Sequence, residues 1–183
     1  MTNKKMALVK AFPPDIKEDV LEAISIIRQT DKLDFLNIFE VYVNKNSMKI
    51  PERIYFNEPT LSDYNSLSAR SQIIIDCLFT RHHDGFIRQR KVEKVIKYCA
   101  QYNWIIPFVI RLTGEYVIEI LQTIKANLAV MDKVSIKQFI NDNEVFYHRI
   151  EQRVISYWNC YHRREYPNEN DYSGFEILKF YNT

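Results

Sequence analysis

Glycine occurs only three times in this 183-residue sequence, and proline only six times. Architectures built from strands and turns need many sharp reversals, and those reversals draw on both residues. The chain therefore has few places at which it can turn tightly, so long uninterrupted segments are expected. Such segments are usually helices, and the scarcity of glycine predicts an all-α protein.

Apolar residues recur at helical spacing along most of the chain. Pro14 and Asp15 favour the start of a first helix, because proline at the first helical position loses no hydrogen bond. Val20, Ile24 and Ile27 then share its inner face. The further helices predicted by this spacing cover residues 32–44, 63–79, 85–101, 104–112, 115–128, 135–140 and 143–166.

Helix caps and irregular segments complete the prediction. Thr30 or Asp31 is expected to cap the helix at 32–44, and Ser135 the short helix that it begins. Residues 45–62 hold two prolines and an apolar run around Tyr55, so an ordered connecting loop is expected there. Residues 172–181 are aromatic-rich, and both a helix and a strand remain open for them.

Short polar turns separate the predicted helices, which gives antiparallel hairpins followed by a long C-terminal helix. A length of 183 residues fits one domain, and 46% apolar residues suffice for a continuous core. We therefore expect residues 1–183 to form a single all-helical domain.

Charge and cysteine content narrow the setting of the protein. The formal net charge is only +2, which does not favour binding to nucleic acid or to anionic lipid. No run of 18 apolar residues occurs, and the N-terminus lacks the apolar stretch of a secretory signal. The three cysteines are odd in number and widely spaced, unlike a disulfide framework or a zinc site. A cytoplasmic location without membrane contact is expected.

The segment His82-His83-Asp84 is the first place to look for metal or acid–base chemistry. Neighbouring histidines in a turn point apart, and no further ligand stands at a recognisable spacing. Asp84 instead suits the N-cap of the helix at 85–101. A structural turn is the favoured interpretation.

Other catalytic patterns are weaker still. His148 and Glu151 are three residues apart on one helix, but only one such pair exists. Cys99 lies on the inward face of its helix, where it is expected to pack as a small apolar residue. Phosphate-binding glycine loops, nucleophile elbows and zinc-protease motifs do not occur in the sequence. We therefore predict no catalytic residue, no metal and no cofactor.

Basic residues form the candidate binding sites. The first is a stripe on the outer face of the helix at 85–101, composed of Arg90, Lys91, Lys94 and Lys97. It is either an ordinary solvated helix face or a contact for an acidic partner or a nucleic-acid backbone. The second lies at the end of the helix at 143–166 and is composed of His162, Arg163 and Arg164. Arginine and aromatic residues often dominate binding surfaces.

Arg88 is the exception on the helix at 85–101, because it falls on the apolar side one turn before Val92. A buried guanidinium requires a partner. A nearby carboxylate is expected, and Asp76, Asp84 and Glu115 are the candidates.

Three runs between residues 71 and 128 resemble HEAT-type helical-repeat proteins of bacteria. They are RHHDGFIR at 81–88, IPFVIRL at 106–112 and GEYVIEIL at 114–121. In such repeats an acidic cap and an inward arginine open one helix, and a proline-initiated helix follows. The resemblance implies a HEAT-like repeat core, although residues 1–65 and 135–183 do not repeat the pattern.

Small helical-repeat proteins of this aromatic-rich type also resemble immunity proteins of bacterial polymorphic toxin systems. That resemblance implies a non-catalytic protein that neutralises one cognate toxin by direct, one-to-one binding in the cytoplasm. The alternatives are a HEAT-like nucleic-acid-binding protein, a base-excision enzyme of that fold, or a general adaptor with several partners. The low net charge disfavours nucleic acid, so a protein partner is the leading hypothesis.

Overall fold

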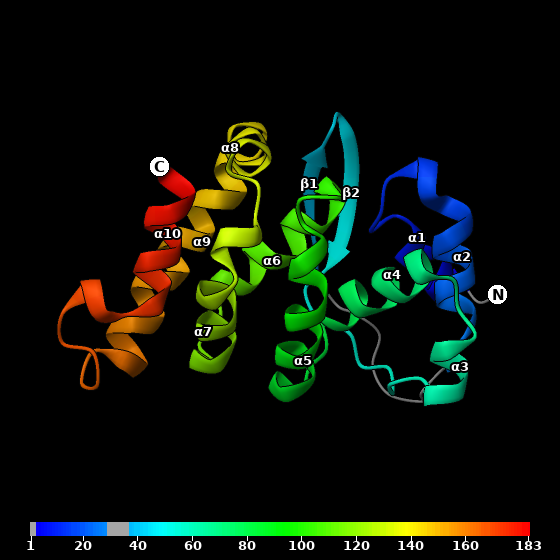
Figure 1. Ribbon diagram of the computed structural model, residues 1–183, viewed down its shortest axis with the longest axis horizontal. Helices are drawn as coiled ribbons and strands as arrows, with labels where there is room; N and C mark the ends of the chain where they lie inside the picture. Colours follow the sequence, from blue (N-terminus) through cyan, green and yellow to red (C-terminus); the bar gives the residue numbers. More distant parts are fainter. Residues whose placement is uncertain (1–2, 29–36) are drawn as a thin grey trace. The chain divides into compact units, whose positions relative to one another are not determined.

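A computed structural model describes residues 3–28 and 37–183 of the chain (Figure 1). These residues contain ten α-helices and one two-stranded sheet, so the chain is mostly helical, as predicted. They form two compact units, Met1–Lys94 and Val95–Thr183. The expectation of a single domain over 1–183 stays a prediction. No helix in the described ranges has both the length and the apolar character needed to cross a membrane.

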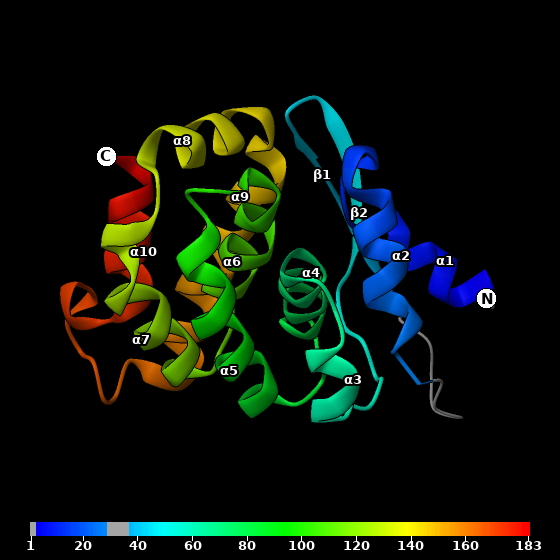
Figure 2. The ribbon, with the colours of Figure 1, turned by 45° about the vertical axis from the view of Figure 1, so that its right-hand side comes forward.

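The first unit is built from helices and a hairpin. Its elements are α1 (Asn3–Val9), a 3-10 turn (Pro14–Ile16), α2 (Lys17–Ser25), β1 (Ile38–Val43), β2 (Asn46–Pro51), α3 (Leu61–Asn65), α4 (Ala69–Phe79) and α5 (Gly85–Val95). Figure 2 shows α1 and α2 beside the hairpin. The first predicted helix is confirmed, because Pro14 begins the helical segment and Val20, Ile24 and Ile27 are buried.

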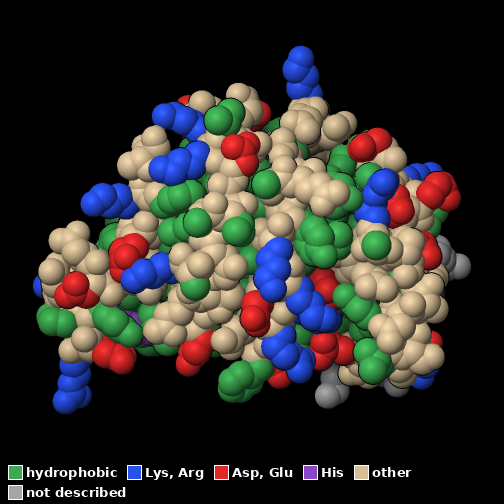
Figure 3. Space-filling view, in the orientation of Figure 1, with side chains coloured by type: hydrophobic (Ala, Val, Ile, Leu, Met, Phe, Trp, Pro, Cys, Tyr) green, Lys and Arg blue, Asp and Glu red, His purple; other side chains and the backbone are tan. Residues whose placement is uncertain are grey.

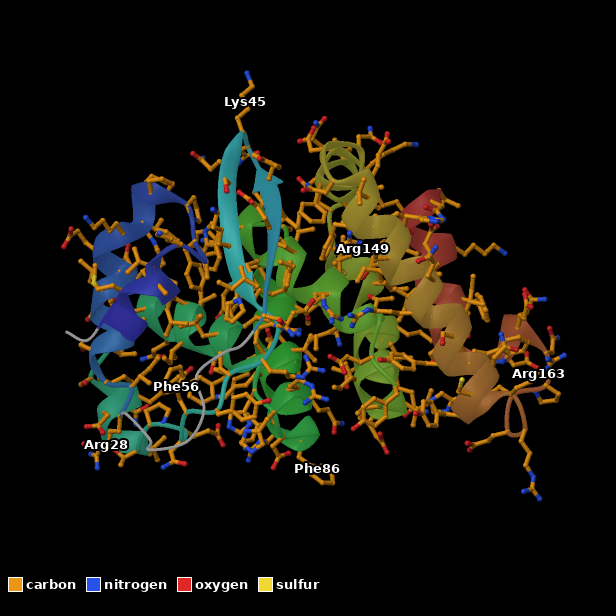
Figure 4. All side chains as sticks on the ribbon, turned by 180° about the vertical axis from the view of Figure 1, so that it is seen from behind. Arg28, Lys45, Phe56, Phe86, Arg149 and Arg163 are labelled. Carbon is orange, nitrogen blue, oxygen red and sulfur yellow. The ribbon has the colours of Figure 1, made fainter. Side chains whose placement is uncertain are left out.

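The hairpin corrects the prediction of a helix at 32–44. Strands β1 and β2 pair antiparallel, and Asn44 and Lys45 form the two-residue turn with positive φ angles of 48° and 67°. Such angles are those of the tight hairpin turns that match strand twist. Lys45 stands at the tip (Figure 4). Residues 32–36 of the predicted helix, and its expected cap at Thr30 or Asp31, lie outside the described residues.

The error has a physical cause in the period of the apolar residues. Val41 and Val43 are buried while Tyr42 between them is half exposed, which is the two-residue alternation of a strand. On β2, Met48 and Ile50 are buried in the same alternating way. Residues 46–51 of the predicted loop are therefore a strand.

The rest of the predicted loop is ordered, as expected, because Arg81 holds it. The Arg81 side chain is fully buried, and its Nη2 donates to the Glu52 carbonyl oxygen at 2.7 Å. Its Nε donates to the Pro51 carbonyl oxygen at 3.3 Å. The backbone N–H of Ile54 then donates to the Arg81 carbonyl oxygen at 2.8 Å. These bonds fix the exit of β2 against the end of α4.

The helix predicted at 63–79 is divided into α3 and α4. Ser68 begins α4 as its N-cap, and its side chain accepts a hydrogen bond from the Ser71 N–H. An N-cap residue has extended backbone angles, so helix α3 cannot continue through it. The apolar run that ends α4 at Phe79 is buried, as predicted.

The second unit surrounds one fully buried helix. Its elements are short helical turns at Ile96–Tyr98, Asn103–Ile105, Leu128–Val130 and Glu169–Asp171, and the helices α6 (Ile106–Thr113), α7 (Ile118–Ala126), α8 (Lys133–Asp142), α9 (Glu144–Tyr157) and α10 (Ser173–Asn182). Every residue of α6 is buried. Helices α7, α8 and α9 pack against α6, and α10 packs against α7 (Figure 1).

Three details of the second unit refine the sequence predictions. Asp132, not Ser135, caps α8, because its carboxylate accepts from the backbone N–H groups of Val134 and Ser135. The segment left open between helix and strand is helix α10. The long C-terminal helix leaves α-helical geometry after Tyr157 and continues as a π-helical turn, Trp158–His162.

Candidate functional site

The basic stripe on α5 is engaged by acidic and aromatic side chains of its own unit. Arg90 Nη2 lies 2.6 Å from Glu58 Oε2. Lys91 Nζ lies 2.7 Å from Asp76 Oδ1 and 3.4 Å from Glu58 Oε1. Lys94 Nζ lies 5.0 Å from the centre of the Tyr64 ring. Figure 3 shows Lys and Arg side chains gathered near α5 with Asp and Glu side chains among them.

Lys91 corrects the interpretation of this stripe as an outer helix face. Lys91 is only 7% exposed, and the Asp76 carboxylate that its ammonium group contacts is buried as well. Tyr64 donates its hydroxyl to the other oxygen of Asp76 at 2.7 Å. The periodicity of α5 could not reveal this, because Glu58, Tyr64 and Asp76 come from elsewhere in the sequence.

The pairing decides what the stripe can offer to a partner. Glu58 and Asp76 offset two of the three positive charges on Arg90, Lys91 and Lys94. A lysine or arginine that already pairs with a carboxylate must give up that ion pair before it can bind a carboxylate or phosphate of another molecule. The stripe therefore stabilises its own unit and is a weak candidate for binding. Lys97, in the other unit, is exposed.

The His82-His83-Asp84 turn is structural, as predicted, but the two imidazole rings do not point apart as expected, because their centroids lie 4.2 Å from each other. His82 Nδ1 accepts from the Asp84 backbone N–H at 3.0 Å, and Nε2 lies 3.0 Å from the Phe56 carbonyl oxygen. Both nitrogens are used, and burial lowers the pKa of His82, so the ring is held neutral with its proton on Nε2. Asp84 accepts from the Phe86 N–H at 2.8 Å, as an N-cap does.

Other candidate chemical groups are committed to packing. Burial raises the pKa of Cys99 to about 12, so its thiol stays protonated. Arg88 is buried, as predicted, and its Nη1 donates to the carbonyl oxygens of His82 and His83 at 2.9 Å each. Its expected carboxylate partner stays a prediction. Within residues 3–28 and 37–183, no group of three or more His, Cys, Asp or Glu side chains could hold a metal ion.

A second candidate surface lies at the C-terminal end of α9, and His162 organises it. The side chain of His162 is buried, and its Nε2 lies 2.8 Å from the Tyr116 carbonyl oxygen. Since a carbonyl can only accept, Nε2 carries the donated proton. The ring also stacks on Tyr172, with centroids 5.2 Å apart. His162 therefore ties the turn that carries Tyr116 to the end of α9.

The π-helical turn places a tyrosine beside this anchored segment. Its defining hydrogen bond runs from the Arg163 N–H to the Trp158 carbonyl oxygen at 2.7 Å. Tyr161 follows Tyr157 by four residues, so the two side chains stay on the same side of the helix. The ring centroids of these two tyrosines are 5.9 Å apart, and each lies 6.0 Å from that of Tyr116.

These three tyrosines form a surface cluster rather than part of the core. Tyr161 is 65% exposed and Tyr116 is 52% exposed, while Tyr157 is partly buried beneath them. An exposed group of mutually packed aromatic rings presents a large rigid area to a partner. Tyrosine is among the residues that most often carry the binding energy of a protein interface.

Arginines continue the same side of α9 toward its N-terminus. Arg149 and Arg153 precede Tyr157 by two helical turns and one helical turn. The stem of Arg153 packs over Gly114, where an added Cβ would lie 3.2 Å from Arg153 Cδ. We name Arg149, Arg153, Tyr157, Tyr161 and Tyr116 the arginine–tyrosine face. Figure 4 shows Arg149 along α9 and Arg163 beyond its C-terminal end.

The predicted residues Arg163 and Arg164 lie next to this face and are exposed. The Arg163 guanidinium lies 5.3 Å from the centre of the Trp158 ring, and its Nη1 donates to Asn159 Oδ1 at 3.3 Å. Arg164 follows Tyr161 by three residues. The sequence prediction therefore named residues that border the arginine–tyrosine face in sequence but none of the residues that form it.

Most of the residues that the sequence prediction did not include in this face could have been found from their spacing. Arg149, Arg153, Tyr157 and Tyr161 recur every four residues, which places them in one row on a helix. Aromatic residues at helical spacing, such as Tyr157 and Tyr161 in the helix predicted at 143–166, by themselves favour an inward stripe. The arginines in the same row show that it borders solvent. Nothing in the sequence indicated that Tyr116 would join them.

Comparison with known proteins adds no relative to this description. No family model matches the sequence, and no curated protein or solved structure is significantly similar to it.

Proposed function

We propose that this chain is a non-catalytic protein-binding protein that acts through the arginine–tyrosine face. In its most specific form, it is an immunity protein that binds one cognate toxin in the cytoplasm and occludes it. The observation that carries the proposal is the cluster of Tyr116, Tyr157 and Tyr161, three packed rings of which two are more than half exposed. Tyrosine and arginine are the residues that most often dominate protein interfaces.

Rigid support of the cluster favours tight binding. His162 fixes the backbone at Tyr116, and the tyrosine rings pack on one another. A surface that is already ordered loses little conformational entropy when a partner docks, so more of the contact energy becomes affinity. One-to-one occlusion of a toxin needs such affinity.

A HEAT-like repeat core is part of the proposal. The runs 106–112 and 114–121, which carry the resemblance, fall on α6 and on the turn that leads into α7. These two consecutive helices pack against each other in the same unit. A consecutive pair of mutually packed helices is the unit from which helical-repeat proteins are built.

Charge supports a protein partner over nucleic acid. Arg90, Lys91 and Lys94 of the basic stripe already meet Glu58, Asp76 and Tyr64. The formal net charge of the chain is +2. Nucleic-acid binding rests on many phosphate contacts, and the paired cations of α5 together with a low net charge do not favour it.

The test is affinity purification of the tagged chain from its native cells, with mass spectrometry of the bound proteins at moderate and high salt. We expect one dominant protein, with recovery lowered about tenfold by Tyr161→Ala, because a central aromatic contact is worth about 1–2 kcal/mol or more. Tyr98→Ala is the matched control, since Tyr98 is also exposed but lies on another element.

If the chain is an immunity protein, its partner must in addition be a toxin. The captured protein should arrest growth when it is expressed alone and be harmless when it is co-expressed with this chain. Equal recovery with Tyr161→Ala and with the unaltered chain would contradict the proposed surface. Recovery of nucleic acid that is released by salt would contradict the proposed class of partner.

A further inference from the structure

The arginines of the arginine–tyrosine face differ from the exposed arginines of the first unit. Arg28 lies 3.1 Å from Asp63, Arg70 lies 3.0 Å from Asp19, and Arg90 lies 2.6 Å from Glu58. These distances are those of formed ion pairs.

Arg149 and Arg153 have no such partner. Among residues 3–28 and 37–183, no carboxylate forms an ion pair with either side chain, and the same holds for Arg164. The carboxylate of Glu151, between them in sequence, lies 3.4 Å from His148. Within the described ranges, three guanidinium groups on or beside one helix are therefore available to bind an anion.

The choice of arginine over lysine in this segment points to a particular anion. All four basic residues from Glu144 to Glu165 are arginines, whereas five of the six elsewhere in the second unit are lysines. A guanidinium presents a planar fork of N–H donors that matches the two oxygens of a carboxylate, and lysine has no such fork. The segment is thus suited to directed, bidentate pairing.

The charge is local to this face, which argues against a general polyanion. The second unit contains ten Lys and Arg residues and ten Asp and Glu residues, so its formal charge is zero. A nucleic-acid strand would bring phosphates against the acidic side chains of the unit as well. A protein surface can place a few carboxylates opposite the arginines alone.

We propose that the surface that docks on this face is acidic, with Asp or Glu carboxylates paired to Arg149 and Arg153 and apolar side chains on the tyrosine cluster. This inference rests on the proposed function and names the chemistry of its partner. The four residues from Arg149 to Arg153 advance about 6 Å along α9. Carboxylates two residues apart on a strand, or four apart on a helix, repeat at nearly that distance, about 6–7 Å.

The test uses the isotope-labelled full chain and three probes in a nuclear magnetic resonance titration. The probes are a short peptide of alternating glutamate and leucine, the same peptide with glutamine in place of glutamate, and oligodeoxythymidine. We expect the acidic peptide to shift the backbone amides of residues 149–161 and 116, with an affinity at least about tenfold above that of the glutamine peptide.

Matched variants separate charge from geometry. The double variant Arg149→Glu and Arg153→Glu should abolish binding of the acidic peptide, while Lys97→Glu with Lys137→Glu, of equal net charge on exposed residues, should leave it unchanged. The conservative pair Arg149→Lys and Arg153→Lys keeps the charge but not the fork, so binding should fall severalfold. Unchanged tyrosine ring signals would confirm that each variant is folded.

Three outcomes would overturn this inference. They are equal binding of the glutamine and glutamate peptides, amide shifts confined to another surface, and tighter binding of oligodeoxythymidine than of the acidic peptide. If the affinity-purified protein still depends on Tyr161 in the first two cases, the proposed function stands and only the acidic character of its partner is wrong.

Discussion

The imidazole Nε2 of His162 donates to the carbonyl oxygen of Tyr116 across 2.8 Å, although the two residues are 46 positions apart. This bond joins the turn before α7 to the end of α9. Tyr116 also carries one ring of the exposed tyrosine cluster, so a buried polar contact sets the position of a surface cluster. Loss of the bond should therefore affect both stability and binding.

The substitution His162→Phe tests this relationship. Phenylalanine keeps a ring to stack on Tyr172 but cannot donate to the Tyr116 carbonyl. We expect the free energy of unfolding to fall by about 1–3 kcal/mol, because a buried acceptor is left without its hydrogen bond. Urea unfolding measures the loss. The Tyr116 amide resonance should shift, and His148→Phe, at an exposed position of the same helix, should change neither quantity.

The buried pair of Lys91 and Asp76 gives a second prediction. Asp76→Ala leaves the Lys91 ammonium inside the protein with only Glu58 at 3.4 Å, and removes the acceptor of Tyr64. We expect a loss of about 3–5 kcal/mol in the free energy of unfolding. Arg90→Ala should cost about 1 kcal/mol or less, because that ion pair is exposed to solvent.

The double substitution Asp76→Leu and Lys91→Met completes this test. It replaces two buried charges with apolar groups, so it should cost less than Asp76→Ala alone. A double variant less stable than the single variant would show that the pair contributes more than mutual neutralisation.

The helical part of the fold followed from periodicity, because packing within a helix depends on neighbours three and four residues away. Val20, Ile24 and Ile27 were placed inward on that basis and are buried. The hairpin was not predicted, because a short apolar run such as Val41, Tyr42 and Val43 is compatible with both the helical and the strand period. The chain reverses direction at Asn44 and Lys45, which have positive φ angles although neither residue is glycine.

The candidate site was harder to predict because its decisive contacts are remote in sequence. Lys91 looked solvated on its helix, and only the fold brings Asp76 to within 2.7 Å of it. His162 looked like part of a basic cluster, although it follows the buried Val154 and Trp158 in steps of four residues and is itself buried. Helical spacing therefore indicates its inward side, but only the fold shows that the Tyr116 carbonyl oxygen lies 2.8 Å from its Nε2.

His82 should make stability depend on pH. Burial lowers its pKa from the ordinary value of 6.5, so the unfolded chain binds a proton more readily than the folded one does. The contribution is therefore fully present above about pH 6.5 and is lost as the pH falls toward the lowered pKa of the folded state. Chemical denaturation from pH 7.5 to 5 should show stability decreasing with acidity.

Two histidine variants isolate that contribution. His82→Gln removes the titrating group and should flatten the decrease, at some cost in stability at neutral pH. His148→Gln removes an exposed histidine and should leave the slope as it is in the unaltered chain. A slope that persists in His82→Gln would assign the pH dependence to another group.

The two glycines of the second unit should respond differently to the same substitution. A Cβ at Gly174 would lie 2.6 Å from Tyr172 Cε1 and 2.8 Å from Val154 Cγ1, both on buried side chains. Gly174→Ala should therefore cost about 1–3 kcal/mol in the free energy of unfolding, because the core must move to admit a methyl group. At Gly114 an added Cβ would meet Arg153 Cδ at 3.2 Å and Arg153 Cβ at 3.3 Å, which are longer contacts than those at Gly174, so Gly114→Ala should cost less than Gly174→Ala. It should instead displace Arg153 and weaken binding of the acidic peptide. Thermal unfolding and the peptide titration measure the two effects, and a larger stability loss at Gly114 than at Gly174 would contradict the packing described for Arg153.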